Sequence, residues 1–190
     1  PSAMQAARWL GSRHLPFTVL TKKSLAKLRR AKVLILSNVN MMDEEEVTAI
    51  RDWVRAGGCL YASGGSSLVT KRGQMQKDFM LADVFGVSIK KADWIDREHY
   101  VTPTPAGQRF FASYDARYPA FVKGYGMETE ARPGAEVFAT TSLGWPTTDT
   151  TKFSSIHSNP PWVATGHPEI VFHRFGQGRV IYCASVIESV

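Results

Sequence analysis

The fold of this protein is decided by the stretch Ala31-Lys32-Val33-Leu34-Ile35-Leu36-Ser37-Asn38-Val39 and by the helix-like sequence that follows it. Residues 33–36 are apolar at every position. Such a run is typical of a parallel strand covered on both faces rather than of a strand with one face in water. We therefore expect a fully buried strand here, with the loop 38–42 at its carboxyl end.

A helix is predicted directly after this loop, from an N-cap at Asp43 to about Ala56. Asp43 and Glu46 have the spacing of a capping box, and Gly57-Gly58 end the helix. The apolar run 59–63 then predicts a second strand. Because strand–helix–strand crossovers are right-handed, the two strands of residues 32–63 should be parallel to each other.

The sequence on either side of this unit is less regular, and from residue 93 onwards Pro, Gly and Thr interrupt short apolar runs. The stretches 71–77 and 143–158 are predicted to be exposed or long loops. The other predicted elements are helices at 4–14 and 78–87, strands at 16–20, 100–102, 121–122, 136–139 and 162–164, and a hairpin at 169–183. The late strands predict a mixed or antiparallel extension of the sheet.

Length and composition indicate one globular domain. The chain has 190 residues, of which 44% are hydrophobic and 21% charged, and this balance excludes disordered, collagen-like and coiled-coil proteins. The net charge is +6, but the basic clusters at 22–32 and 71–77 have no aromatic platform for bases, so no nucleic-acid partner is expected. No apolar stretch approaches the roughly 18 residues of a membrane span, so no membrane partner is expected either. We expect a soluble protein, with the cytoplasm as the favoured compartment.

Small and polar residues follow both predicted parallel strands at their carboxyl ends, where open α/β sheets bind their ligands. The stretch 64–67 lacks the Lys-Ser/Thr pair of a P-loop and the Gly-x-Ser-x-Gly of a hydrolase elbow, so a plain turn and a ligand-binding loop both stay open. The candidate binding residues are Asn38, Asn40, Met41, Met42, Ser63, Gly65 and Ser66 at the strand ends, with His157 and Trp162 from later loops.

No catalytic residue, metal site or cofactor is predicted. The five histidines lack the paired spacing of metal ligands, and no Gly-x-Gly-x-x-Gly follows a strand. Cys59 and Cys183 lie inside apolar runs, which predicts buried free thiols rather than nucleophiles.

The chain resembles the class I glutamine amidotransferase-like domain that is attached to certain glycoside hydrolases, and the resemblance is carried by residues 31–39, 42–45 and 50–58. In β-galactosidases this domain is called the trimerisation domain. The stretches 83–87, 157–161 and 175–182 extend the resemblance over most of the chain, although a similar order occurs in trehalose-utilisation-like proteins. True amidotransferases of this fold carry a cysteine on the turn after the strand and a later His-Glu pair. Here the turn near 63–66 has no cysteine, and His167-Pro168-Glu169 begins the last hairpin, so no glutaminase activity is expected.

The resemblance implies an α/β fold of the flavodoxin-like three-layer α/β/α type, with a mostly parallel sheet and an antiparallel C-terminal extension. The family's opening strand precedes the helix that begins here, so residues 1–190 are expected to be a single accessory domain from a longer multidomain protein. Its implied function is that of a noncatalytic accessory or oligomerisation domain of a glycoside hydrolase. Its implied partners are the catalytic barrel of the same protein and sister subunits, in a homo-oligomer such as a trimer. The alternative is a stand-alone small-molecule binding protein or hydrolase that uses the 64–67 crevice.

Overall fold

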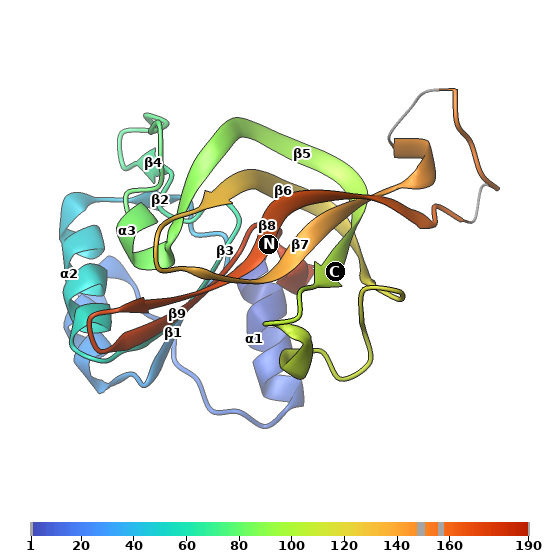
Figure 1. Ribbon diagram of the computed structural model, residues 1–190. Helices are drawn as coiled ribbons and strands as arrows, with labels where there is room; N and C mark the ends of the chain where they lie inside the picture. The colour runs from blue at the N-terminus through green and yellow to red at the C-terminus, as the bar shows by residue number, and fades with distance from the viewer. Residues whose placement is uncertain (1, 148–150, 156–157, 190) are drawn as a thin grey trace.

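The described part of the protein, residues 2–147, 151–155 and 158–189 of a computed structural model, folds around a seven-stranded sheet of order β1-β3-β9-β8-β7-β5-β6 (Figure 1). The strands are β1 (Val33–Leu36), β3 (Cys59–Ser63), β5 (Val87–Pro103), β6 (Ala120–Ala131), β7 (Glu136–Gly144), β8 (Pro161–Phe175) and β9 (Gly178–Cys183). A small second sheet pairs β2 (Met41–Met42) with β4 (Val69–Thr70). The helices are α1 (Ser2–Ser12), α2 (Glu44–Arg55) and α3 (Ala82–Phe85), with 3-10 turns η1 (Lys22–Arg30), η2 (Gln108–Phe110), η3 (Trp145–Thr147) and η4 (Ile187–Ser189).

The predicted strand–helix–strand unit is confirmed as β1, α2 and β3. β1 and β3 are parallel, with Val33 opposite Cys59 in the register. The predicted capping box is also present, since the Asp43 side chain accepts a hydrogen bond from the Glu46 amide and the Glu46 side chain accepts one from the Asp43 amide. This reciprocal cap fixes the start of α2.

The last strand, β9, joins the two halves of the sheet. It runs parallel to β3 on one side and antiparallel to β8 on the other, because the tight turn at Gly176 makes β8 and β9 a hairpin. Beyond β9 the sheet continues antiparallel through β8, β7, β5 and β6. The predicted antiparallel extension is therefore confirmed, but it forms the larger part of the sheet, whereas the sequence predicted a mostly parallel one.

The main core lies between α2, α3 and one face of the parallel strands. Val54, Val84 and Phe85 from the helices are completely buried against Leu60 and Tyr182 from the strands. The Tyr182 ring stacks on Phe85 with the ring centroids 5.3 Å apart, and its hydroxyl donates a hydrogen bond to the Gly64 carbonyl. This polar anchor satisfies the one hydrophilic group of a fully buried side chain.

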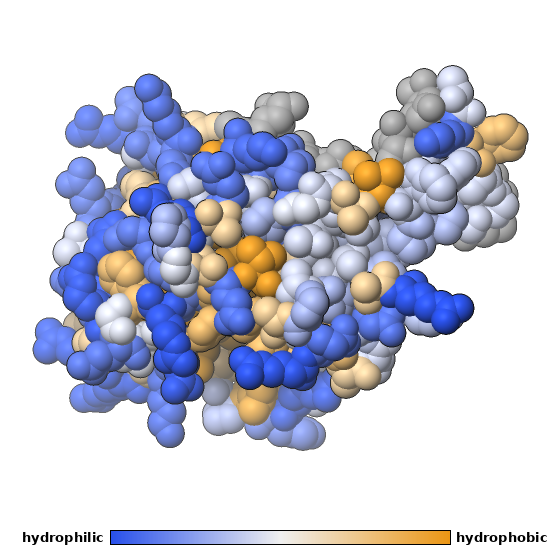
Figure 2. All heavy atoms as spheres, in the orientation of Figure 1, coloured by the Kyte–Doolittle hydropathy of each residue, from blue (hydrophilic) through white to orange (hydrophobic). Residues whose placement is uncertain are grey.

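The expectation that β1 is covered on both faces is wrong. Leu34 and Leu36 pack into the main core, but Val33 is 57% exposed and Ile35 36% exposed on the other face. α2 covers only one side of the strand, and the apolar run could not show which side that would be. In the view of Figure 2, hydrophilic side chains dominate the end of the molecule that holds α2, and apolar ones gather toward its middle.

Other predicted elements differ in extent. No strand forms at 16–20, because no neighbouring strand pairs with this segment, and the turn η1 follows it. The helix predicted at 78–87 is shortened to α3, which ends where Gly86 adopts the left-handed conformation. The loop predicted at 143–158 begins two residues later than expected, after the end of β7, and opens with η3. None of the helices in the described ranges is long and apolar enough to span a bilayer.

Candidate functional site

The carboxyl ends of β1 and β3, where a ligand was expected, hold a side chain from the chain's own C-terminal turn. The Glu188 carboxylate of η4 accepts hydrogen bonds from the hydroxyls of Ser37 (2.5 Å), Ser63 and Tyr61 (2.9 Å). Burial raises the pKa of Tyr61, so its hydroxyl stays protonated and able to donate. Three hydroxyl donors thus converge on one internal carboxylate.

The turn after β3 is equally engaged with the protein itself. Ser63 and Ser66 are completely buried. The Ser66 Oγ accepts a hydrogen bond from the Val39 amide and lies 2.8 Å from the Ser63 carbonyl oxygen, to which it donates. The Gly65 amide donates to the Asn38 side chain at 3.0 Å. The groups that could have bound a phosphate or carried a nucleophile therefore hold the two loops together.

The structure brings together four of the candidate binding residues: Asn38, Ser63, Gly65 and Ser66. Met41 and Met42 lie in the small second sheet, Met41 half exposed and Met42 buried, and the Asn40 side-chain oxygen is buried without a hydrogen-bond partner in the described part of the chain. Trp162 lies at the start of β8 and packs edge-on against Trp145. His157 lies outside the described residues. Whether any of these residues binds a ligand stays a prediction.

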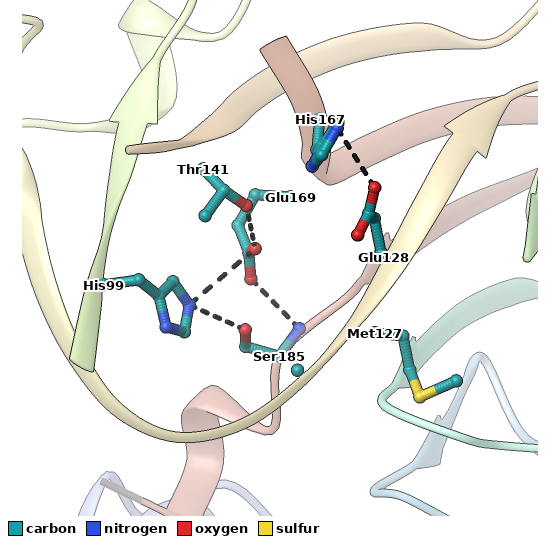
Figure 3. Close-up of a pocket in the computed structure, with 8 residues that line it drawn as sticks. His99, Met127, Glu128, Thr141, His167, Glu169 and Ser185 are labelled. Atoms are coloured by element: carbon teal, nitrogen blue, oxygen red, sulfur yellow. Dashed lines mark hydrogen bonds and ion pairs between the residues drawn. The ribbon is translucent and has the colours of Figure 1, made fainter. Parts of the chain in front are cut away.

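A second polar cluster is buried in the antiparallel half of the molecule, around His99, Thr141, Glu169 and Ser185 (Figure 3). The His99 Nε2 atom lies 2.9 Å from the Ser185 Oγ and 3.8 Å from Glu169 Oε2. Glu169 also accepts hydrogen bonds from the Thr141 hydroxyl at 2.8 Å and from the Ser185 amide at 3.0 Å. The cluster joins β5, β7 and β8 to the segment that follows β9.

The Glu169 carboxylate is ionised in this setting. Burial alone would raise its pKa, but the hydrogen bond and charge of His99, with the donors on Ser185 and Thr141, hold the pKa below its usual value. A buried carboxylate is tolerable only when its oxygens are saturated by such donors. Glu169 is therefore a structural anchor whose charge matters to stability.

The serine, histidine and glutamate of this cluster do not form a catalytic triad. In a triad the two imidazole nitrogens face different partners, whereas here the same nitrogen of His99 faces both Ser185 and Glu169. All three residues are also at most 3% exposed, so a substrate has no access to them in this structure. The cluster has the residue types of a hydrolase without its geometry.

The neighbouring histidine, His167, pairs with a different carboxylate. Its Nε2 atom lies 3.2 Å from Glu128 Oε1, and the Lys90 ammonium approaches both groups. His167 and Glu169 have the sequence spacing of an amidotransferase pair, but their side chains contact separate partners. Within the described residues, no three His, Cys, Asp or Glu side chains are arranged to hold a metal ion.

The two cysteines lack the properties of nucleophiles. Both are free; Cys183 is completely buried, and Cys59 is half-buried rather than fully buried as predicted. Burial raises the pKa of the Cys183 thiol well above its usual value, which keeps it protonated and unreactive.

The family of the chain follows from comparison with known proteins. A family model described as the β-galactosidase trimerisation domain matches residues 8–190. The chain belongs to this family. No curated protein sequence matches it significantly.

Solved structures that resemble this trimerisation domain include the GH42 β-galactosidase Gan42B of G. stearothermophilus, in a catalytic mutant form, with a TM-score of 0.69 and 19% identity over 96% of the chain. The cold-adapted β-galactosidase of Rahnella sp. R3 gives a TM-score of 0.62 and 18% identity over 84% of the chain. The α-L-fucosidase isoenzyme 2 of Paenibacillus thiaminolyticus gives a TM-score of 0.61 and 23% identity over 83% of the chain. The chain spans only 23%, 21% and 22% of the respective lengths of these proteins.

Glu169→Gln tests the buried carboxylate. Because the pKa of Glu169 is lower in the folded chain than its usual value of 4.5, its ionised form stabilises the fold above pH 4.5, and this stabilisation is lost as the pH falls through the folded pKa. Urea unfolding between pH 7 and pH 3 should show a loss on the order of 3 kcal/mol for E169Q at pH 7 and a shallower decline with acid than in the wild type. The exposed Glu130→Gln should behave like the wild type. Equal acid dependence of E169Q and the wild type would refute the role of this charge.

Glu188→Ala tests the closure of the strand-end crevice. The change leaves the hydroxyls of Ser37, Ser63 and Tyr61 without their shared acceptor, so the free energy of unfolding should fall by about 2 kcal/mol. E188Q keeps an acceptor oxygen and should lose less. The exposed Glu136→Ala is the matched control, and a loss in E188A no larger than in E136A would mean that the three hydroxyls do not depend on the carboxylate.

Proposed function

We propose that this trimerisation domain is the noncatalytic, oligomerising part of a longer glycoside hydrolase. The observation that carries the proposal is the engagement of the polar strand-end groups by Glu188, which takes up the hydroxyls of Ser37, Ser63 and Tyr61 where enzymes of open α/β folds bind a substrate. The small share of each neighbour chain that the domain spans also supports a parent protein several times longer. The residues that cleave carbohydrate would then lie in another domain of that parent.

The partners in this proposal are the catalytic barrel of the same protein and sister subunits, assembled as a homo-oligomer such as a trimer. The description of the family as a trimerisation domain supports the assembly. We infer a cytoplasmic location for the parent enzyme, in agreement with two cysteines that stay unpaired.

We further infer that the parallel half derives from the flavodoxin-like three-layer fold of class I glutamine amidotransferases. The crossover from β1 through α2 to β3 supports this origin. The turn where amidotransferases carry their nucleophile falls near residues 63–66 in this chain, and its Ser63 is fully buried and donates to Glu188 rather than to a histidine. In this proposal the chain keeps the strand–helix–strand architecture of that fold. It does not include glutaminase activity, because the cysteine nucleophile and its histidine base are both missing.

The alternative function, a stand-alone binding protein or hydrolase that uses the 64–67 crevice, has less support. The hydroxyls and amides of that turn are engaged within the chain, and no described nucleophile there has a histidine partner.

Light scattering on the full-length parent protein tests the oligomerising role. We expect a trimer for the intact protein and a smaller assembly when the region corresponding to residues 1–190 is deleted, because the subunit contacts that involve this domain are then lost. A glycosidase activity assay before and after the deletion shows whether the domain affects catalysis as well as oligomerisation. A monomeric intact protein, or an assembly unchanged by the deletion, would rule out the oligomerising role.

A further inference from the structure

The parallel half of the sheet has one face that α2 and α3 do not cover, and η4 reaches it only at Tyr61 among the described contacts. In the register of β1, β3 and β9, Ile35 lies beside Tyr61 and Tyr61 beside Ile181, and side chains opposite one another on neighbouring strands point to the same face. α2 and α3 pack on the other face. We call this surface the open face and define it by Val33, Ile35, Cys59, Tyr61, Phe172, Arg174, Arg179 and Ile181.

The open face continues as an aromatic band into the antiparallel half. The Phe172 ring lies nearly parallel to that of Phe138, with centroids 5.4 Å apart, and Phe138 stacks in turn on Phe110 at 4.6 Å. Phe110 is 58% exposed and Val33, at the opposite end of the band, 57%. Phe138 itself is buried, so the stacked rings extend the apolar packing from the open face to the exposed Phe110. Exposed apolar side chains grouped in this way mark an interaction site more often than scattered ones do.

Two arginines lie within this apolar surface. Arg174 and Arg179 are paired in the register of β8 and β9, and both are exposed. The Arg174 guanidinium rests near the Phe172 ring, and in the described part of the chain neither arginine has a carboxylate partner. Arginine is the cation enriched at protein interfaces, where its planar group pairs with carboxylates. The open face therefore fits a partner surface that is apolar and carries acidic side chains.

Both ends of the described chain lie at the border of the open face. Tyr61 points to this face and donates to Glu188, so η4 lies on the same side of the sheet. α1 contacts η4, and the Ser2 hydroxyl donates a hydrogen bond to the Ser37 carbonyl. Along α1 and the segment that follows it, further large apolar side chains are exposed: Met4, Trp9, Leu15, Phe17 and Val19.

We propose that the open face is covered by the catalytic domain of the same polypeptide, through a contact surface that is apolar and presents carboxylates to Arg174 and Arg179. This inference rests on the proposed function, which supplies a catalytic domain. A domain joined to the chain beside the open face has a high effective concentration there and binds it without a second molecule. A second copy that docked with its own open face would instead bring arginines against arginines.

Thiol labelling of the full-length parent tests this contact. Val33→Cys places a thiol on the open face, and Met75→Cys places one at a site of matched exposure, 55% against 57%, in the loop after β4. Alkylation followed by peptide mass spectrometry should modify the V33C thiol at least tenfold more slowly than the M75C thiol. Equal rates would overturn the proposal.

Dilution distinguishes protection by the same chain from protection by a sister subunit, because it dissociates the oligomer. Light scattering on the same samples reports the oligomeric state. Protection of V33C that persists in monomers supports the catalytic domain of the same chain, whereas protection lost on dissociation assigns the face to a sister subunit and overturns the proposal. A protein that is monomeric throughout but protects V33C would refute the trimer and still support this contact, so the two failures are distinguishable.

Charge reversal tests the acidic partner. In the V33C background, R174E together with R179E should raise the alkylation rate toward that of M75C, because the new carboxylates repel those of the partner surface. The exposed Arg72→Glu, on the loop that also holds Met75, should leave the rate of V33C unchanged. Unchanged protection in the double variant would overturn the carboxylate pairing.

Discussion

The pairing of β9 with β3 is the constraint on which the rest of the structure depends. β9 is the last strand in the described residues, yet it lies inside the sheet, parallel to β3 and antiparallel to β8, so within the sheet it joins the early strands β1 and β3 to the later antiparallel strands. Its Tyr182 stacks on Phe85 of α3 and donates to Gly64 at the end of β3. The first half of the chain therefore cannot complete its sheet or its core until the last residues are in place.

The residues after β9 connect both halves of the sheet through two buried or partly buried carboxylates. The Ser185 amide donates a hydrogen bond to the buried Glu169 carboxylate, and Glu188 accepts hydrogen bonds from the hydroxyls at the ends of β1 and β3. Both carboxylates stand among serines and, for Glu169, beside a histidine, which are residue types that enzymes use for catalysis. Here they hold the segment after β9 in place, and the surface that we propose for function is the open face rather than a pocket.

Prediction from sequence succeeded where the signals are local. The capping box of Asp43 and Glu46, the apolar runs of β1 and β3 and the glycine turn of the last hairpin each act within a few residues. The position of β9 beside β3 was not predictable, because it joins residues more than a hundred positions apart. Glu188 and His99 carry no motif, since their roles arise only when distant strands meet. The exposure of Val33 was missed for a further reason: an apolar run does not reveal whether its cover comes from the same domain or from another.

Amide hydrogen exchange on this chain tests most directly whether the crevice is closed by the chain's own end. The amides of Ala184 and Ser185 donate to Glu169, and that of Ser189 to the Val186 carbonyl, within the segment anchored by Glu188. If β9 and its C-terminal segment hold the sheet and fill the crevice, the amides of β3, of β9 and of Ala184 and Ser185 should exchange together in the slowest class. Fast exchange at Ala184 and Ser185 beside a protected β9 would mean that the crevice opens readily and is free to bind a ligand.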